Sequence, residues 1–149
     1  MFSKILVPLD YSNFSKKSLQ VAIEIGKKFN SKLTLIHIIE ASEKYKRSGI
    51  TGKIRRKQAH TISDEDIPED SYNLLEMSKA LVLIEGLSVE TVFKKGNIVD
   101  EILEKAELGK FDLITMGARG QGPIRKLLLG SVSSGVLEKA TCPVLVTRI

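Results

Sequence analysis

The sequence has few of the residues that crosslink or anchor a protein. Cysteine occurs once in 149 residues, at Cys142, so no disulfide can form within the chain. There are only two histidines, His37 and His60, so the sequence has no group of Cys and His residues with the spacing of zinc ligands. Tryptophan is absent, and no apolar run approaches the ~20 residues that a membrane-spanning helix needs. The composition predicts a cytoplasmic protein of one domain, residues 1–149, with no signal peptide.

The charge is moderately basic but unevenly placed. The formal net charge is +5, from 23 Lys and Arg against 18 Asp and Glu. Basic residues gather in residues 44–57, and an acidic group follows at once in residues 64–70. Such a change in the sign of the charge over a short segment is typical of a solvated insertion, so we do not expect nucleic-acid binding. The polar residues 42–70 are predicted to be a variable insertion.

Short apolar runs predict strands at residues 4–9, 33–39, 111–116 and 143–149, and the alternation of SVETVFKKG predicts an edge-type strand at residues 88–96. Segments with helical periodicity separate these runs. The first helix is predicted from Ser15, with Ser15 or Asn13 as its N-cap and Phe29 on its buried face. The second is predicted to bury Met77 and Leu81. Two more helices follow, one capped by Asn97 and the other over residues 131–141.

This alternation predicts an α/β fold, with an open five-stranded parallel sheet and helices on both faces. Ligands of such sheets bind at the carboxyl ends of the strands. Asp10 lies at that edge after the first strand, residues 38–40 after the second, and a glycine-rich stretch, GARGQGPIRKLLLGS (117–131), after the fourth.

The glycine-rich stretch has the features of a phosphate-binding turn. Gly117 follows the strand directly, while Gly120 and Gly122 permit positive φ angles that turn successive N–H groups toward one anion. Gly130 and Ser131 open the fourth helix, where unpaired N–H groups and the helix dipole attract phosphate. Ser131 and Ser133 are expected to add hydroxyl donors, and Arg119, Arg125 and Lys126 positive charge.

Several alternatives to this interpretation exist. The stretch could be a surface loop in which Gly130 only begins a helix. Asp10 could cap the first helix, His37 lies within an apolar strand as core histidines do, and Cys142 is expected to be a small packing residue. A Walker A loop, a Rossmann glycine fingerprint after the first strand and a serine-hydrolase elbow are all missing. A phosphotransfer receiver would need an acidic residue after the third strand, where the sequence has KKG (94–96).

The spacing of these glycines resembles a known family. Gly117-x2-Gly120-x9-Gly130-Ser131 is similar to the G-x2-G-x9-G-[ST] signature of the universal stress protein family, in its ATP-binding branch. The segments KILVPLDYS, LTLIHII and CPVLV also resemble the first, second and last strands of that family. The resemblance extends over nearly the whole chain except about residues 42–70.

The resemblance implies a sheet of order 3-2-1-4-5, of the adenine nucleotide alpha hydrolase-like fold, with ATP across strands one and four. It implies Mg²⁺ or Mn²⁺ bridging the phosphates, and a homodimer paired through the last strand, residues 143–148. The base and ribose would contact Pro8, Leu9, Asp10, Ile38, Met116 and Gly117. The phosphates would contact Gly120, Gly130, Ser131, Val132 and Ser133.

Two functions remain open from the sequence. The first is an ATP-binding regulatory or stress-response protein, in which hydrolysis is at most slow or dependent on a partner, because no general base or phosphate-gripping lysine is evident. The second is a dimeric scaffold or interaction module that uses no nucleotide.

Overall fold

A twisted five-stranded parallel sheet organises the computed structural model, which describes residues 1–41, 62–120 and 129–149. The strands are β1 (Lys4–Pro8), β2 (Lys32–Glu40), β3 (Ser88–Gly96), β4 (Leu113–Gly117) and β5 (Val144–Thr147). Their order is β3-β2-β1-β4-β5, and every neighbouring pair is parallel. The predicted sheet and its 3-2-1-4-5 order are therefore confirmed.

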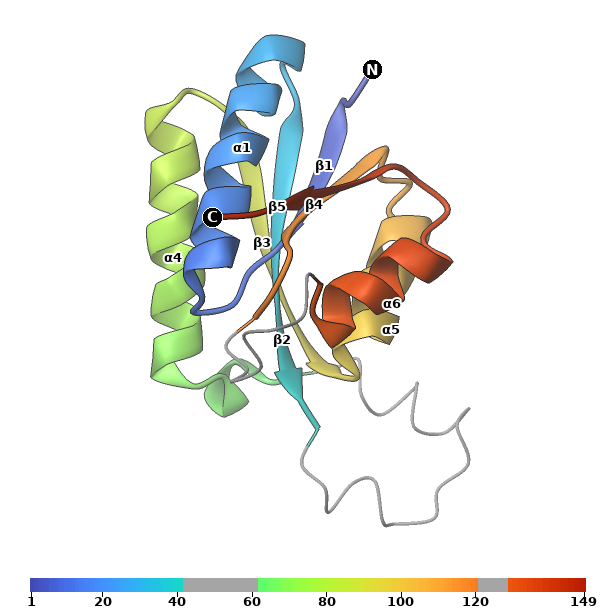
Figure 1. Cartoon of the computed structure of the whole chain (residues 1–149). Helices are drawn as coiled ribbons and strands as arrows, with labels where there is room; N and C mark the ends of the chain where they lie inside the picture. The colour runs from blue at the N-terminus through green and yellow to red at the C-terminus, as the bar shows by residue number, and fades with distance from the viewer. Residues whose placement is uncertain (42–61, 121–128) are drawn as a thin grey trace.

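Helices cover both faces of the sheet, as predicted (Figure 1). The helices α1 (Asn13–Phe29) and α4 (Glu69–Ile84) lie on one face. The helices α5 (Ile98–Leu108) and α6 (Ser131–Lys139) lie on the other. The winding reverses between β1 and β4, because β1 leads to β2 on one side while β4 lies on its other side. Sheets of this kind bind ligands at such a reversal.

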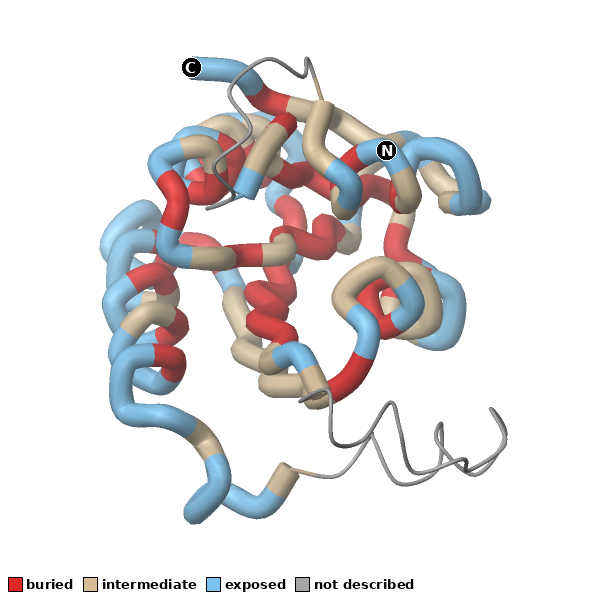
Figure 2. Tube along the Cα trace, turned by 60° about the horizontal axis from the view of Figure 1, so that its bottom comes forward, coloured by how far each residue is buried: buried red, intermediate tan, exposed pale blue. Residues whose placement is uncertain are grey.

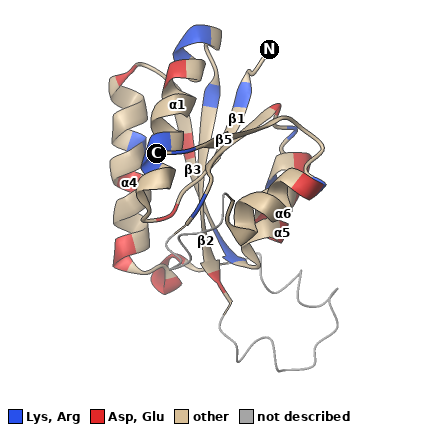
Figure 3. Cartoon of the chain, viewed as in Figure 1, with Lys and Arg blue, Asp and Glu red and all other residues tan. Residues whose placement is uncertain are grey.

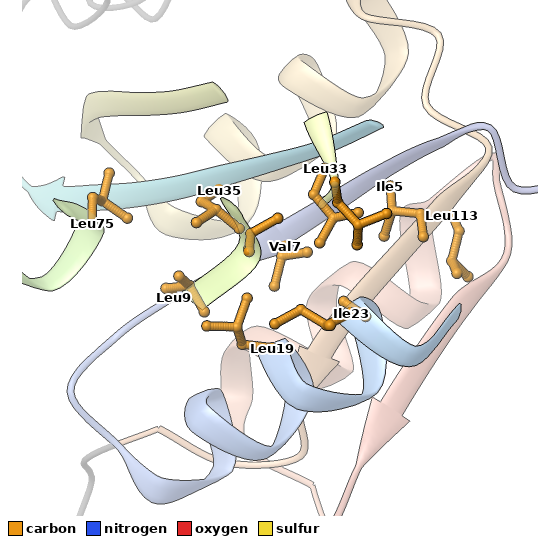
Figure 4. Close-up of a cluster of buried hydrophobic side chains, with 12 residues drawn as sticks. Ile5, Val7, Leu9, Leu19, Ile23, Leu33, Leu35, Leu75 and Leu113 are labelled. Carbon is orange, nitrogen blue, oxygen red and sulfur yellow. The ribbon is translucent and has the colours of Figure 1, made fainter. Parts of the chain in front are cut away.

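Two apolar cores hold the layers together, one on each face (Figure 2). In the first, strand residues such as Val7 and Leu35 pack against Leu19 and Ile23 of α1 and Leu75 of α4 (Figure 4). Full burial of one such aliphatic side chain contributes about 1.5–3 kcal/mol. The second core joins the opposite side chains of the same strands to α5 and α6. Side chains of β1 and β2 thus alternate between the two cores, so the central strands read as continuous apolar runs.

The helix starts agree with the sequence for α5 and differ for α1. Asn97 caps α5, where its side chain accepts a hydrogen bond from the Asp100 N–H at 3.0 Å. The N-cap of α1 is Ser12, whose Oγ accepts from the Ser15 N–H at 3.1 Å. The prediction of Asn13 or Ser15 as the cap was therefore wrong, because both residues already have helical backbone.

Three apolar residues predicted to be buried are exposed. Phe29 lies at the last turn of α1 and is 41% exposed, while Met77 and Leu81 of α4 are 71% and 55% exposed. The inward face of α4 carries Leu75, together with Ser78 and Val82, which belong to the predicted periodicity. The helix has apolar residues on both sides, so hydrophobic periodicity alone did not identify the face that contacts the sheet.

The polar insertion was predicted to end at about residue 70. A short 3₁₀ helix, η1 (Asp64–Asp66), lies within it, and α4 begins at Glu69. Residues 42–61, with their basic cluster, lie outside the described residues. Elsewhere, both Lys or Arg and Asp or Glu occur on the helices (Figure 3). Within the described ranges, no helix is long and apolar enough to cross a membrane.

Candidate functional site

A cavity of about 520 Å³ opens at the carboxyl ends of β1, β2 and β4. Its volume is within the range of small-molecule sites in proteins. The structure brings to its wall all the positions predicted from the sequence to bind the ligand: Pro8, Leu9, Asp10, Ile38, Met116, Gly117, Gly120, Gly130, Ser131, Val132 and Ser133.

One part of the wall is apolar and formed by four elements. The side chains come from β2, β4 and the first turns of α5 and α6, and belong to or pack against the second core: Ile36, Ile38, Ile98, Ile102, Met116 and Val132. Because strand and helix side chains enclose this space from opposite sides, it has the form of a slot between the sheet and the two helices. Such a slot suits a flat apolar group better than a charged one.

The backbone of Ile38 offers hydrogen bonds to this slot. Ile36 O accepts a hydrogen bond from the Leu9 N–H at 2.8 Å, so the even-numbered residues of β2 direct their backbone groups toward β1. The last paired residue of β1 is Pro8, opposite Ile36. The N–H and C=O of Ile38 therefore point past the end of β1, toward the cavity.

Asp10 stands between the slot and the glycine-rich stretch. Its Oδ1 accepts hydrogen bonds from the N–H of Ser12, at 2.8 Å, and from the Ser12 hydroxyl. Its own N–H donates to Ser15 Oγ at 2.9 Å. Asp10 thus supports the residue that caps α1 and is not itself the cap. A Cβ placed on Gly120 would lie 2.8 Å from Asp10 Oδ2, so this oxygen faces the glycine-rich stretch.

The polar end of the cavity is the first turn of α6. The first backbone hydrogen bond of this helix joins the Ser134 N–H to Gly130 O at 3.0 Å, so the N–H groups of Ser131, Val132 and Ser133 have no acceptor within the helix. No side chain caps the helix, and no acidic residue lies in its first turn. By contrast, α1 and α5 have side-chain caps, and α4 has two acidic residues in its first turn. The start of α6 is therefore suited to an anion.

The two ends of the glycine-rich stretch meet at Ala118. Its carbonyl oxygen accepts hydrogen bonds from the Gly130 N–H at 2.7 Å and from Ser133 Oγ at 2.7 Å. Ser133 is buried and its hydroxyl also lies 3.1 Å from Gly130 O, so without a ligand this hydroxyl is engaged within the protein. The Ser133 N–H remains available. Gly122, Arg125 and Lys126, also considered from the sequence, lie outside the described residues.

The three glycines of the signature have different surroundings. A Cβ on Gly117 would lie 2.7–3.0 Å from Phe14, including its backbone, so this glycine lets α1 approach the end of β4. Gly120 does not have a positive φ, contrary to the prediction. At Gly130, with φ −77° and ψ 171°, a Cβ would have no neighbour nearer than 3.4 Å among residues 1–41, 62–120 and 129–149. Among the described residues, no contact requires glycine at Gly130.

His37 and Cys142 have the structural roles expected from the sequence. Both ring nitrogens of the buried His37 are hydrogen-bonded, to Leu9 O at 2.8 Å and to Ser71 Oγ at 3.2 Å. Cys142 packs against the second core, and burial raises the pKa of its thiol above the ordinary value. Across residues 1–41, 62–120 and 129–149, no group of three or more His, Cys, Asp and Glu could hold a metal ion.

Sequence reasoning missed part of the wall. Ile98 and Ile102, at the start of α5, line the cavity but were not among the residues predicted to bind the ligand. Because β3 ends at the same edge of the sheet, the helix that follows it begins beside the cavity. The predicted order of strands and helices therefore already implied that the start of α5 could line the site. Glu40 also lines the cavity, one residue beyond the apolar run of β2.

Comparison with known proteins gives a consistent result. The family model "Universal stress protein family" matches residues 1–148. Universal stress protein YxiE of Bacillus subtilis is 31% identical over 150 residues, which cover 99% of this chain and 100% of that protein. The solved structure of MJ0577 of Methanocaldococcus jannaschii is 27% identical with a TM-score of 0.77, covering 100% of this chain and 97% of the other.

Two other solved structures, each 22% identical with a TM-score of 0.69, share the fold. One is a universal stress protein in complex with cAMP, covering 98% of this chain and 96% of that one. The other is the universal stress protein of Archaeoglobus fulgidus in complex with dAMP, covering 99% of this chain and 100% of that one. The fold is the adenine nucleotide alpha hydrolase-like fold. The chain belongs to the universal stress protein family.

Proposed function

We propose that this protein binds ATP in the cavity, with adenine in the apolar slot and the phosphates at the first turn of α6. The observation that carries the proposal is the uncapped start of α6 at one end of a slot whose other end offers the open backbone of Ile38. Two proteins of the same fold bind cAMP and dAMP, which share the adenine base.

The base end suits adenine because of its pattern of donors and acceptors. Adenine has an N–H donor on its 6-amino group next to the N1 acceptor. A strand residue presents one C=O and one N–H to the same side, so Ile38 can accept from the amine and donate to N1. Leaving one such buried group unpaired costs about 1–3 kcal/mol, which corresponds to roughly 5- to 150-fold in affinity.

The ribose and phosphates would follow from this placement. Asp10 Oδ2 is the acceptor for a ribose hydroxyl, beside Met116 and Gly117. The phosphates would receive hydrogen bonds from the first N–H groups of α6, with Gly120 and Gly130 leaving room for their oxygens. Arg119 lines the same end and adds positive charge.

A Mg²⁺ or Mn²⁺ ion would be held mainly by the phosphates. Mg²⁺ usually keeps several waters and takes one or two protein carboxylates together with phosphate oxygens. The described wall fits this in a limited way, because Asp10 is the carboxylate nearest the phosphate end and Ser131 the exposed hydroxyl there. When bound, the ion would neutralise phosphate charge.

We propose a nucleotide-dependent regulatory role in the stress response, rather than a fast ATPase. The titratable residues of the described wall are Asp10, His37, Glu40 and Arg119. His37 has both ring nitrogens engaged, and Asp10 uses one oxygen to hold Ser12. Hydrolysis by the protein alone is therefore expected to be slower than about one turnover per second.

We also propose a homodimer that pairs through β5. This strand is at the edge of the sheet, and its residues Val144, Leu145 and Val146 are only half-buried. An apolar edge strand without cover invites pairing with another chain. A two-fold axis beside β5 would cover the same strand in both copies.

A matched pair of substitutions tests the ATP site. In Ser131→Asp, a carboxylate occupies the first turn of α6, where it stabilises the helix by about 0.3–1 kcal/mol but repels phosphate. Ser134→Asp makes the same change of charge at an exposed position outside the cavity. Calorimetric titration with ATP and Mg²⁺ should show tight binding by the wild type and Ser134→Asp, and none by Ser131→Asp. Equal binding by all three proteins would contradict the proposal.

A further inference from the structure

A chain of hydrogen bonds runs from α4 along one face of the sheet and ends at Leu9, on the cavity wall. The ring of His37 lies on the face of α1 and α4, because its neighbours in β2 point to the other face. The His37 Nε2 atom lies 3.2 Å from Ser71 Oγ of α4, which in turn is 3.0 Å from Tyr11 OH. Ring contacts with Tyr11 and Phe93, at centroid distances of 5.6 and 6.5 Å, enclose the imidazole.

The partners of the ring determine which nitrogen carries the proton. Leu9 O lies 2.8 Å from Nδ1, and a carbonyl oxygen can only accept, so Nδ1 donates. In the uncharged imidazole Nε2 is then an acceptor, and the Ser71 hydroxyl donates to it. Tyr11 OH completes the chain by donating to Ser71 Oγ. The side chain of His37 is therefore held in one tautomer and one orientation.

This contact changes the end of the β1–β2 ladder. The Leu9 N–H binds Ile36 O at 2.8 Å, as in a regular parallel ladder. In such a ladder, the Leu9 carbonyl would next accept from the Ile38 N–H. Between these described residues that hydrogen bond is not formed, and the carbonyl accepts from His37 Nδ1 instead.

We infer that His37 is a positioning residue for the nucleotide site: by holding the Leu9 carbonyl, it keeps the Ile38 N–H open for the base. The inference rests on the proposed function in so far as adenine is the group that uses this N–H. It assigns an effect on base recognition to a wall residue whose ring points toward α4 and is hydrogen-bonded to Ser71. It also makes the anchoring of α4 at Ser71 part of the site.

The first test needs no nucleotide. Amide exchange of Ile38 is measured by NMR in wild-type protein, His37→Leu and His37→Asn. The leucine removes the donor, so the Leu9 carbonyl returns to Ile38 and its amide exchange slows by about tenfold or more. The asparagine retains an N–H donor near the position of Nδ1, and exchange stays at the wild-type rate. Equal Ile38 exchange in all three proteins would overturn the inference.

The tautomer gives a spectroscopic test on the unmodified protein. Nitrogen-15 spectra of the histidine rings are simple to assign, because the chain has only His37 and His60. The inference requires the proton of His37 on Nδ1 and an acceptor at Nε2. A His37 ring that carries its proton on Nε2 alone would overturn it, whatever the stability of the variants.

The second test uses two ligands, ATP and inorganic tripolyphosphate. His37→Leu should weaken the binding of ATP by about tenfold and leave the binding of tripolyphosphate unchanged, because only the contact with the base is lost. Ser71→Ala should weaken ATP in the same selective way, although Ser71 does not line the cavity. Ser78→Ala, a buried serine on the same face of α4, is the matched control and should bind as wild type. Equal losses for both ligands would reduce His37 to a general structural role and overturn the inference.

These outcomes separate the two proposals. If the wild type binds no ATP, the proposed function fails, while the exchange of the Ile38 amide and the tautomer still decide the role of His37. If ATP binds but His37→Leu changes neither ATP affinity nor Ile38 exchange, the inference alone fails.

Discussion

Alanine substitutions at the signature glycines should separate stability from binding. At Gly117, the added Cβ would lie 2.7 Å from Phe14 Cβ and 2.8 Å from its backbone carbon, so α1 must move. Overpacking of this kind costs about 1–3 kcal/mol. For a chain of this size that cost lowers the melting temperature by about 2–12 °C.

Gly130→Ala should have the opposite profile. Within the part of the chain that the structure describes, its Cβ would have no neighbour closer than 3.4 Å, and the φ of −77° suits alanine. The expected loss of stability is about 0.5–1 kcal/mol, because alanine is a poorer N-cap than glycine. The added methyl would project toward Arg119 and the Gly120 N–H, where a phosphate oxygen must approach. Loss of one hydrogen bond to a charged group would lower the affinity for ATP by roughly 10- to 100-fold.

Gly120→Ala provides the intermediate case. Its Cβ would displace only the Asp10 carboxylate, from a distance of 2.8 Å to Oδ2, so folding should be affected less than in Gly117→Ala. The assays are thermal unfolding without nucleotide and calorimetric titration with ATP. The reasoning is refuted if Gly130→Ala binds ATP as tightly as wild type, or if Gly117→Ala melts at the wild-type temperature.

Three further predictions concern other parts of the molecule. Val146→Lys should convert the proposed β5 dimer into monomers in sedimentation equilibrium, whereas a wild-type monomer would remove the dimer proposal. The Lys32 ammonium, 2.7 Å from Glu90, lowers the pKa of that carboxyl below its ordinary 4.5. The half-exposed pair therefore stabilises the fold above about pH 4.5 and by less than about 1 kcal/mol, and this contribution disappears as pH falls through the folded-state pKa. Urea unfolding should show Glu90→Gln less stable than wild type at neutral pH, by a difference that shrinks as the pH falls below 4.5. A difference that stays constant with pH would contradict this. Burial raises the pKa of Cys142, so iodoacetamide should modify it more slowly than free cysteine, and equal rates would contradict that burial.

The sequence predicted the sheet well because its central strands are buried on both faces. Runs such as LTLIHII (33–39) have no polar alternation, and helical periodicity between them left a doubly wound sheet as the consistent arrangement. Prediction was poorer for the side of a helix that faces the sheet. Met77 and Leu81 fit the apolar periodicity of α4 but are exposed, because only tertiary packing chooses between two apolar sides.

The candidate site was likewise predicted in part from the sequence. Spacing located Gly117, Gly120 and Gly130 at one cavity, but it did not give the physical reason for each glycine. Gly117 is explained by the approach of Phe14, a contact between segments about 100 residues apart. The engagement of the Ser133 hydroxyl by Ala118 O likewise depends on how the two ends of the stretch meet. Such contacts between distant segments leave no local pattern in the sequence.

The central claim is that this cavity selects an adenine nucleotide. Native mass spectrometry of the purified protein, incubated with equal concentrations of ATP and GTP in the presence of Mg²⁺, tests it most directly. The account predicts one ATP bound per chain and little or no GTP adduct. No adduct of either nucleotide, or equal adducts of both, would contradict it.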